Sequence, residues 1–141
     1  MEEGTFEKVG QSEKRMYGPK GIIVCGYPPS EHSFLLMFTE KAGFHDRPVI
    51  FAGSNDASTC LKEILSLPAL WGMGEVSEMP RALILSGFTH KELHQVMSAY
   101  RHAGLPRQFW ATLTPVSETW TVGRLLEELQ KENKALSKSS S

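Results

Sequence analysis

The sequence lacks most of the features that reveal a biochemical function directly. Its two cysteines are too few for the disulfide framework of a small secreted domain. Its 15 basic and 16 acidic side chains give a net charge of −1 without a basic block, so nucleic acid is not an expected partner. The longest apolar runs, 21–25 and 34–38, are far too short to span a membrane, and the polar start does not resemble a signal peptide. We therefore expect a cytoplasmic protein without membrane contact.

Motifs for metal, cofactor or catalytic chemistry are missing as well. No glycine-rich nucleotide fingerprint occurs, and no pair of acids flanks an expected cleft. His90 and His94 share one helix face, but no H-E-x-x-H or C-x-x-C pattern supplies the further ligands of a metal site. We predict no cofactor, no metal and no catalytic residue. Whether the protein is an enzyme stays open, with the non-enzymatic interpretation favoured.

What the sequence does contain is a pair of similar segments. Cys25-Gly26-Tyr27 resembles Ser86-Gly87-Phe88, and Ala42-Gly43-Phe44 resembles Ala103-Gly104-Leu105, with the same offset of 61 residues. A shared offset indicates an internal repeat, and a repeat constrains the architecture. We expect a single domain at 16–136, made of repeat one at 16–67 and repeat two at 80–136. A disordered lead-in at 1–15 and a disordered tail at 137–141 flank it.

Each half is predicted to form a strand, a helix, a second strand and a second helix. The strands are expected at 21–25, 48–52, 82–85 and 108–113, and the fourth elements at 59–67 and 121–136. Thr89 and Glu92 have the spacing of a capping box, and Pro29 suits the first position of a helix, with Glu31 matching Glu92. Both first helices are expected to end at a glycine, Gly43 and Gly104.

This order of elements predicts a three-layer α/β fold. Strands joined through a helix are normally parallel, so two β-α-β-α units give a mostly parallel four-stranded sheet in the order 2-1-3-4. The two first strands are expected to pair in parallel at the centre, and the gap between them is then a topological switch point, where such sheets bind ligands. Its lip would contain Gly26, Tyr27, Gly87, Phe88 and Thr112. Two separate layers or a domain-swapped dimer remain open alternatives.

Individual residues in these segments allow two interpretations. Gly26 and Gly87 precede helix starts, where backbone N–H groups bind anions, but a glycine that only permits the turn is the favoured interpretation. Cys25 also precedes a helix start, which favours a reactive thiolate. Because Ser86 matches it in the second half, a small buried packing residue is the better interpretation of Cys25.

Several segments also resemble a known family. They are Met16-Tyr17-Gly18-Pro19, the two Gly-aromatic turns, Trp110-Ala111-Thr112-Leu113-Thr114-Pro115 and Trp120-Thr121. Together they are similar to a bacterial family of small duplicated domains of unknown function, over roughly residues 16–134. The resemblance implies a cytoplasmic bacterial protein, and it assigns no activity, substrate, cofactor or catalytic residue.

Two functions therefore compete. The first is a non-catalytic regulatory or protein-interaction module that contacts a second copy or another protein through Phe34, Met37 and Phe38, with Trp71 from the 68–80 loop. It rests on a helix that is apolar around more than one face, since exposed apolar patches usually mark contacts. The second is a domain that binds a small ligand or anion, enzymatic or not, at the switch-point crevice.

Overall fold

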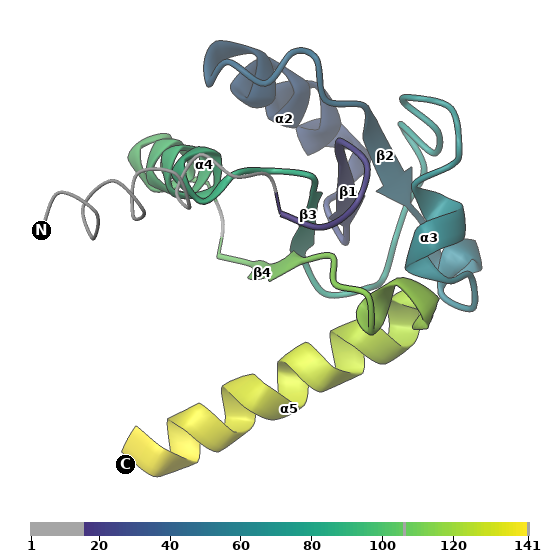
Figure 1. Cartoon of the computed structure of the whole chain (residues 1–141), viewed down its shortest axis with the longest axis vertical. Coiled ribbons are helices and arrows are strands. Elements are labelled where there is room, and N and C mark those ends of the chain that lie inside the picture. Colours follow the sequence, from purple (N-terminus) through teal and green to yellow (C-terminus); the bar gives the residue numbers. More distant parts are fainter. Residues whose placement is uncertain (1–15, 106, 141) are drawn as a thin grey trace, which may run out of the picture.

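The computed structural model describes residues 16–105 and 107–140, except for the side chains of 134–140 (Figure 1). The predicted lead-in at 1–15 lies outside the described residues. The four strands are β1 (Gly21–Cys25), β2 (Val49–Ala52), β3 (Ala82–Ser86) and β4 (Phe109–Thr112). The helices are α2 (Pro29–Lys41), α3 (Leu61–Ile64), α4 (His90–His102) and α5 (Val122–Ser140), with the 3₁₀ turns η1 (Ser54–Asp56) and η2 (Ser117–Thr119).

Local signals place the helix ends as predicted. Thr89 caps α4, because its hydroxyl accepts from the Glu92 N–H at 3.0 Å while the Glu92 carboxylate accepts from the Thr89 N–H at 3.0 Å. α2 begins with Pro29 at its first position, and its N-cap has no side-chain hydrogen bond. Gly43 and Gly104, with φ of 95° and 69°, follow the two helices in the left-handed conformation. α5 continues to Ser140, past the predicted end at 136 and into the segment expected as a tail.

The sheet has the predicted order, β2-β1-β3-β4, and its two outer pairs are parallel. Ile23 pairs with Ile50 in the first half, and Ile84 pairs with Ala111 in the second, so positions 61 residues apart share one register. Both halves have the same order of elements. The fold class and strand order are therefore confirmed, while the sequence duplication stays a prediction.

The central pair differs from the prediction, because β1 and β3 run antiparallel. Gly21 lies opposite Ser86, and Cys25 lies opposite Ala82. The connection between the halves explains the reversal. After β2 the chain passes along the sheet to Leu65, whose side chain reaches Gly21, and Leu70 and Trp71 then bond to β2 on the way back. Because the chain travels the length of the sheet and then returns, β3 starts at the end of the sheet where β2 stopped. The expected parallel central pair was wrong.

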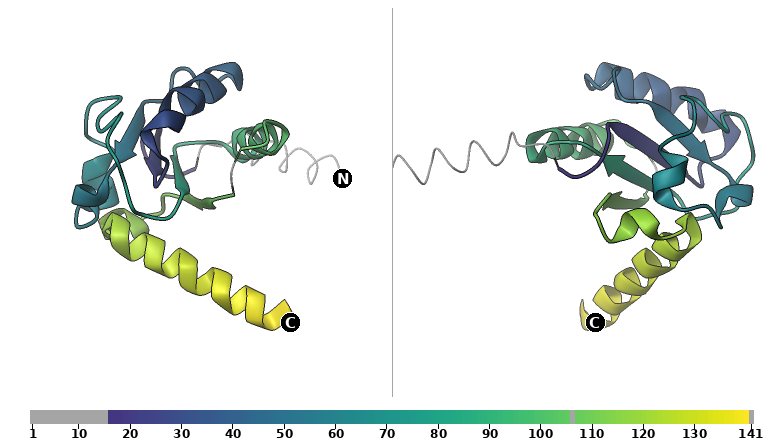
Figure 2. Two further views of the ribbon diagram at one scale, coloured as in Figure 1. Left: turned by 180° about the vertical axis from the view of Figure 1, so that it is seen from behind. Right: turned by 45° about the vertical axis from the view of Figure 1, so that its right-hand side comes forward.

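Helices cover both faces of the sheet, as Figures 1 and 2 show. α2 and α4 bury one face, and their core includes Leu35, Val96 and Tyr100. α3 and α5 bury the other, with Leu61, Ile64 and Leu125 in its core. Two separate cores around one sheet make the three layers that the sequence predicted. None of the described helices combines the length and apolar character needed to cross a bilayer.

Candidate functional site

The antiparallel centre separates the residues of the predicted crevice. Gly26 and Tyr27 follow β1 at one end of the sheet, whereas Gly87 and Phe88 follow β3 at the opposite end. Thr112 of β4 pairs with Leu85 of β3 and therefore lies at the same end of the sheet as Gly87. A single crevice cannot contain both turns, so the predicted switch-point site between β1 and β3 is wrong.

Each turn is instead covered by the chain itself. Gly26 and Gly87 have φ of 77° and 73°, a backbone conformation that residues with a side chain rarely adopt. A methyl group on Gly26 would overlap the carbonyl oxygens of Met79 and Pro80, and the Gly87 N–H already donates to Tyr17 at 3.2 Å. Tyr27 and Phe88 are core side chains, 1% and 0% exposed. The interpretation of these glycines as turn residues agrees with this geometry.

Beyond each turn lies an arginine from the other half of the chain. Glu31 and Glu92 each sit in the first turn of the helix that follows their turn. Arg81 pairs with Glu31 and covers the Tyr27 ring, and Arg47 pairs with Glu92 and covers the Phe88 ring. We name these groups the Arg81 corner (Tyr27, Glu31 and Arg81) and the Arg47 corner (Phe88, Glu92, Arg47 and Asp46).

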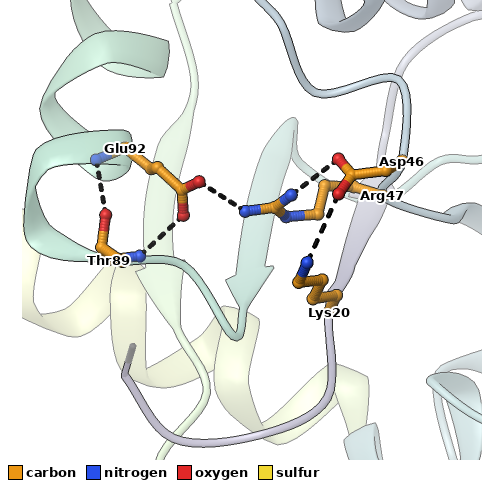
Figure 3. Close-up of polar contacts among 5 residues, drawn as sticks. All are labelled: Lys20, Asp46, Arg47, Thr89 and Glu92. Atoms are coloured by element: carbon orange, nitrogen blue, oxygen red, sulfur yellow. Dashed lines mark hydrogen bonds and ion pairs between the residues drawn. The ribbon is translucent and has the colours of Figure 1, made fainter. Parts of the chain in front are cut away.

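The Arg47 corner is closed (Figure 3). The Arg47 side chain is 5% exposed, and its two terminal nitrogens reach Asp46 at 2.6 Å and Glu92 at 2.7 Å. Its guanidinium carbon lies 4.9 Å from the centre of the Phe88 ring. Partial burial alone would raise the pKa of Glu92, but the Thr89 N–H and the Arg47 guanidinium outweigh it and hold that pKa below its ordinary value. This buried cation therefore joins the two halves.

The Arg81 corner is more open. The Arg81 and Glu31 side chains are 34% and 32% exposed, and one nitrogen, Nη2, reaches the two Glu31 oxygens at 3.2 and 3.4 Å. The Arg81 guanidinium lies over the Tyr27 ring, and the Tyr27 hydroxyl forms a hydrogen bond with the Tyr100 hydroxyl at 2.6 Å. Burial and this bond raise the pKa of Tyr27, so the phenol stays protonated.

A cleft of about 480 Å³ lies beside the Arg81 corner. Sequence reasoning missed this site. The available signal was an arginine immediately before β3 and another just before β4, because neighbouring parallel strands bring the residues that precede them together. The lining residues of this Arg81 cleft are Pro80, Arg81, Arg107, Gln108, Phe109 and Asn133.

The predicted interface residues separate into two groups. Phe34, Met37 and Phe38 line one groove of 340 Å³ between α2 and α4, although Phe38 itself is only 8% exposed. The remaining walls are Lys41, Ala42, Ala99 and Ala103. Trp71 does not line this α2–α4 groove, because the 68–80 loop follows the outer edge of β2.

The 68–80 loop is tied to the fold at that edge. The Leu70 N–H donates to Val49 at 2.7 Å, and the Trp71 carbonyl accepts from the Phe51 N–H at 2.8 Å. The buried ring of His32 adds an anchor, since its Nδ1 accepts from the Gly74 N–H and its Nε2 donates to the Tyr27 carbonyl, both at 2.9 Å. His32 thus holds the loop in place. The loop in turn covers β2, an edge strand that would otherwise present unpaired backbone groups.

Cys25 is a packing residue in the structure. It is 0% exposed, and burial, with the nearby charge of Asp56, raises the pKa of its thiol to about 12. Ser86, at the matching position, is equally buried, and its hydroxyl has no hydrogen-bond partner among the described residues. Within the described residues, no three His, Cys, Asp or Glu side chains gather as a metal site, and His90 and His94 lie exposed on α4.

Fold and surfaces together define a small three-layer α/β domain with a mixed four-stranded sheet. Residues 81–136 of this chain match the model of a family described as a domain of unknown function, DUF3783. The match lies within the second half of the chain, whereas the resemblance noted in the sequence extended over roughly 16–134. It includes Arg81 and Glu92 but neither of their partners, Glu31 and Arg47. Searches of the curated proteins and of the solved structures found no match.

Proposed function

We propose that this protein is a non-catalytic protein-interaction module, with a regulatory role, whose α2–α4 groove binds a second copy of the chain. The observation that carries the proposal is the exposure of Phe34 and Met37, which are 50% and 54% exposed beside a hollow. Burying a large apolar side chain contributes about 1.5–3 kcal/mol. Two such side chains on one helix therefore favour a contact that covers them.

The shape of the groove favours a second copy as the occupant. A twofold dimer needs a surface that complements itself, with a projection and a matching hollow on the same patch. Phe34 and Met37 project from α2, while Ala99 and Ala103 on the α4 side are too small to fill the space opposite them. A twofold axis through the groove would place the aromatic ring of each protomer over the alanines of its partner.

The charges at the groove agree with this arrangement. Among the described residues, Lys41 is the only charged side chain in the lining, and Glu40 precedes it at the exposed end of α2. The aliphatic stem of Lys41 can cover apolar surface while its ammonium group stays in water, so Lys41 does not prevent burial of the groove. Stable interfaces bury about 800 Å² per partner, and this groove is a small part of that area. We expect an affinity in the micromolar range.

The test is sedimentation equilibrium of the wild type and of a Phe34→Glu, Met37→Glu double variant. The wild type is expected to dimerise, and the double variant to remain monomeric, because two carboxylates would be desolvated at the interface. Both positions are half exposed in one protomer, so the variant should fold, which circular dichroism checks.

Two control variants make the result specific. Val116→Glu changes an apolar side chain that is 66% exposed and lies outside the groove, so it should leave the dimer unchanged. Trp71→Glu tests the 68–80 loop, and loss of the dimer only in this variant would move the interface there and contradict the groove. A wild type that stays monomeric at millimolar concentration would refute the proposal.

We also propose a cytoplasmic location. The two cysteines support it, because both thiols are free and Cys60 is partly exposed, which suits a reducing compartment. Labelling of the native protein with a thiol reagent should modify Cys60 and leave Cys25 unmodified.

A further inference from the structure

The Arg81 cleft has the lining of an anion site. Two guanidinium groups, Arg81 and Arg107, and two amides, Gln108 and Asn133, surround it, and none of its six lining residues is acidic. Guanidinium and amide N–H groups are the donors that proteins use for phosphate and carboxylate oxygens. Pro80 and Phe109 add an apolar wall. The lining therefore suits a small molecule with an anionic group on an apolar body.

The two corners explain why a ligand belongs at Arg81 and not at Arg47. Both terminal nitrogens of Arg47 are occupied, by Asp46 and by Glu92. Arg81 uses only Nη2, at a longer 3.2 Å, and its Nη1 has no hydrogen bond to any described residue. The Nε of each arginine is buried without a partner among the described residues. Arg81 therefore retains one terminal nitrogen for a ligand on a side chain that is 34% exposed, whereas both terminal nitrogens of Arg47 are engaged.

Arg107 adds a second positive charge that the fold does not use. It is exposed two residues before β4, and no ion pair links it to any described residue. Glu31 balances Arg81, so the cleft keeps the charge of Arg107 in excess. A net positive cleft with a low-dielectric wall attracts anions.

We propose that the Arg81 cleft binds a small organic anion, with a phosphate or carboxylate held by Arg81 and Arg107 and an apolar body against Phe109 and Pro80. The volume of 480 Å³ lies within the roughly 300–1,000 Å³ typical of small-molecule sites. Five of its six lining residues fall within residues 81–136, the segment that matches the family. The site is therefore largely a property of that segment, and it is separate from the α2–α4 groove.

The test is a titration of ¹⁵N-labelled protein with phenyl phosphate, followed by amide chemical shifts. Saturable shifts are expected at Arg81, Arg107 and Phe109, with a dissociation constant on the order of millimolar. Arg107→Gln should weaken binding about tenfold, because it removes a charge-assisted hydrogen bond. Inorganic phosphate should bind roughly threefold more weakly than phenyl phosphate, since it has no ring to place against Phe109.

Arg101→Gln is the matched control. It removes the same charge from an exposed position at the end of α4, outside the cleft, and should change the affinity less than about twofold. Equal weakening by the two variants would identify nonspecific attraction and overturn the proposal. Shifts that never saturate, or that avoid the cleft, would overturn it too. The titration reads the cleft directly, so its outcome does not depend on whether the protein dimerises.

Discussion

The Arg47 and Arg81 corners are built from the same kinds of residue, yet they differ in burial. Each has a Gly-aromatic turn, a glutamate in the first turn of the next helix and an arginine over the ring. Arg47 is 5% exposed and Arg81 is 34% exposed. One arrangement therefore makes a buried clamp between the halves, and the other leaves a cation at a cleft. Local burial, more than residue type, separates the arginine that is enclosed by the fold from the one that lies at the proposed binding cleft.

The sequence around each corner accounts for the difference. Thr89 caps α4 and holds Glu92 in a capping box, while Pro28 at the equivalent position of α2 has no side-chain cap to hold Glu31. Asp46 precedes Arg47 and supplies a second carboxylate. Pro80 precedes Arg81 and supplies none. The closed corner thus has two fixed acceptors for its cation, and the open corner has one.

The largest effect should come from Arg47→Met. Arg47 is buried, but Asp46 and Glu92 are 47% and 28% exposed, so the carboxylates that remain stay hydrated. The loss of charge-assisted hydrogen bonds should then cost about 1.5–3 kcal/mol. Urea unfolding should therefore show a large loss of unfolding free energy. Adding Glu92→Gln to this variant should recover part of it. A loss below about 1 kcal/mol would show that Arg47 is not a clamp.

Acid should weaken the same corner to a smaller extent. The folded pKa of Glu92 lies below its ordinary value of 4.5, so its contribution to stability is present above that pH and is lost as the pH falls through the folded pKa. The melting temperature should fall in this range. The melting temperature of Glu92→Gln should fall less steeply with decreasing pH than that of the wild type. An equal slope in both proteins would show that Glu92 does not cause the acid sensitivity.

Tyr27→Phe makes the open corner resemble the closed one. It deletes the hydroxyl that bonds to Tyr100 at 2.6 Å in a buried position, which should cost about 1 kcal/mol of unfolding free energy. Because Phe88 fills the same place in the other turn, the fold should be kept. Phe88→Tyr is the reciprocal change, and it should cost more, since that ring is fully buried beneath Arg47. A similar unfolding free energy for both variants would mean that the two corners do not differ in whether they accommodate a hydroxyl on the aromatic ring.

The smallest effect on stability is expected for Arg81→Met. Partly exposed ion pairs contribute about 0–1 kcal/mol, so unfolding in urea should change little. The contrast with Arg47→Met is the direct measure of the difference between the corners. A loss as large as that of Arg47→Met would make Arg81 a second clamp and would weaken its assignment to the cleft.

Much of the local structure was predictable because its signals lie within a few residues. The buried apolar run 21–25 is β1, the Thr89–Glu92 spacing forms the capping box, and Gly43 and Gly104 end their helices. The strand order 2-1-3-4 was also predicted correctly. The candidate site was not, since the crevice depended on the relative direction of β1 and β3.

That direction depends on how often the 53–81 connection passes along the sheet, and no short motif encodes this number. Leu65 beside Gly21 and the Leu70 bond to Val49 record two passes, which place the Gly-aromatic turns at opposite ends. Hydrophobic periodicity, caps and turn glycines were enough to define strands, helices and their order. Long-range packing alone determined which arginine covers which ring, because Arg47 and Arg81 reach residues more than forty positions away.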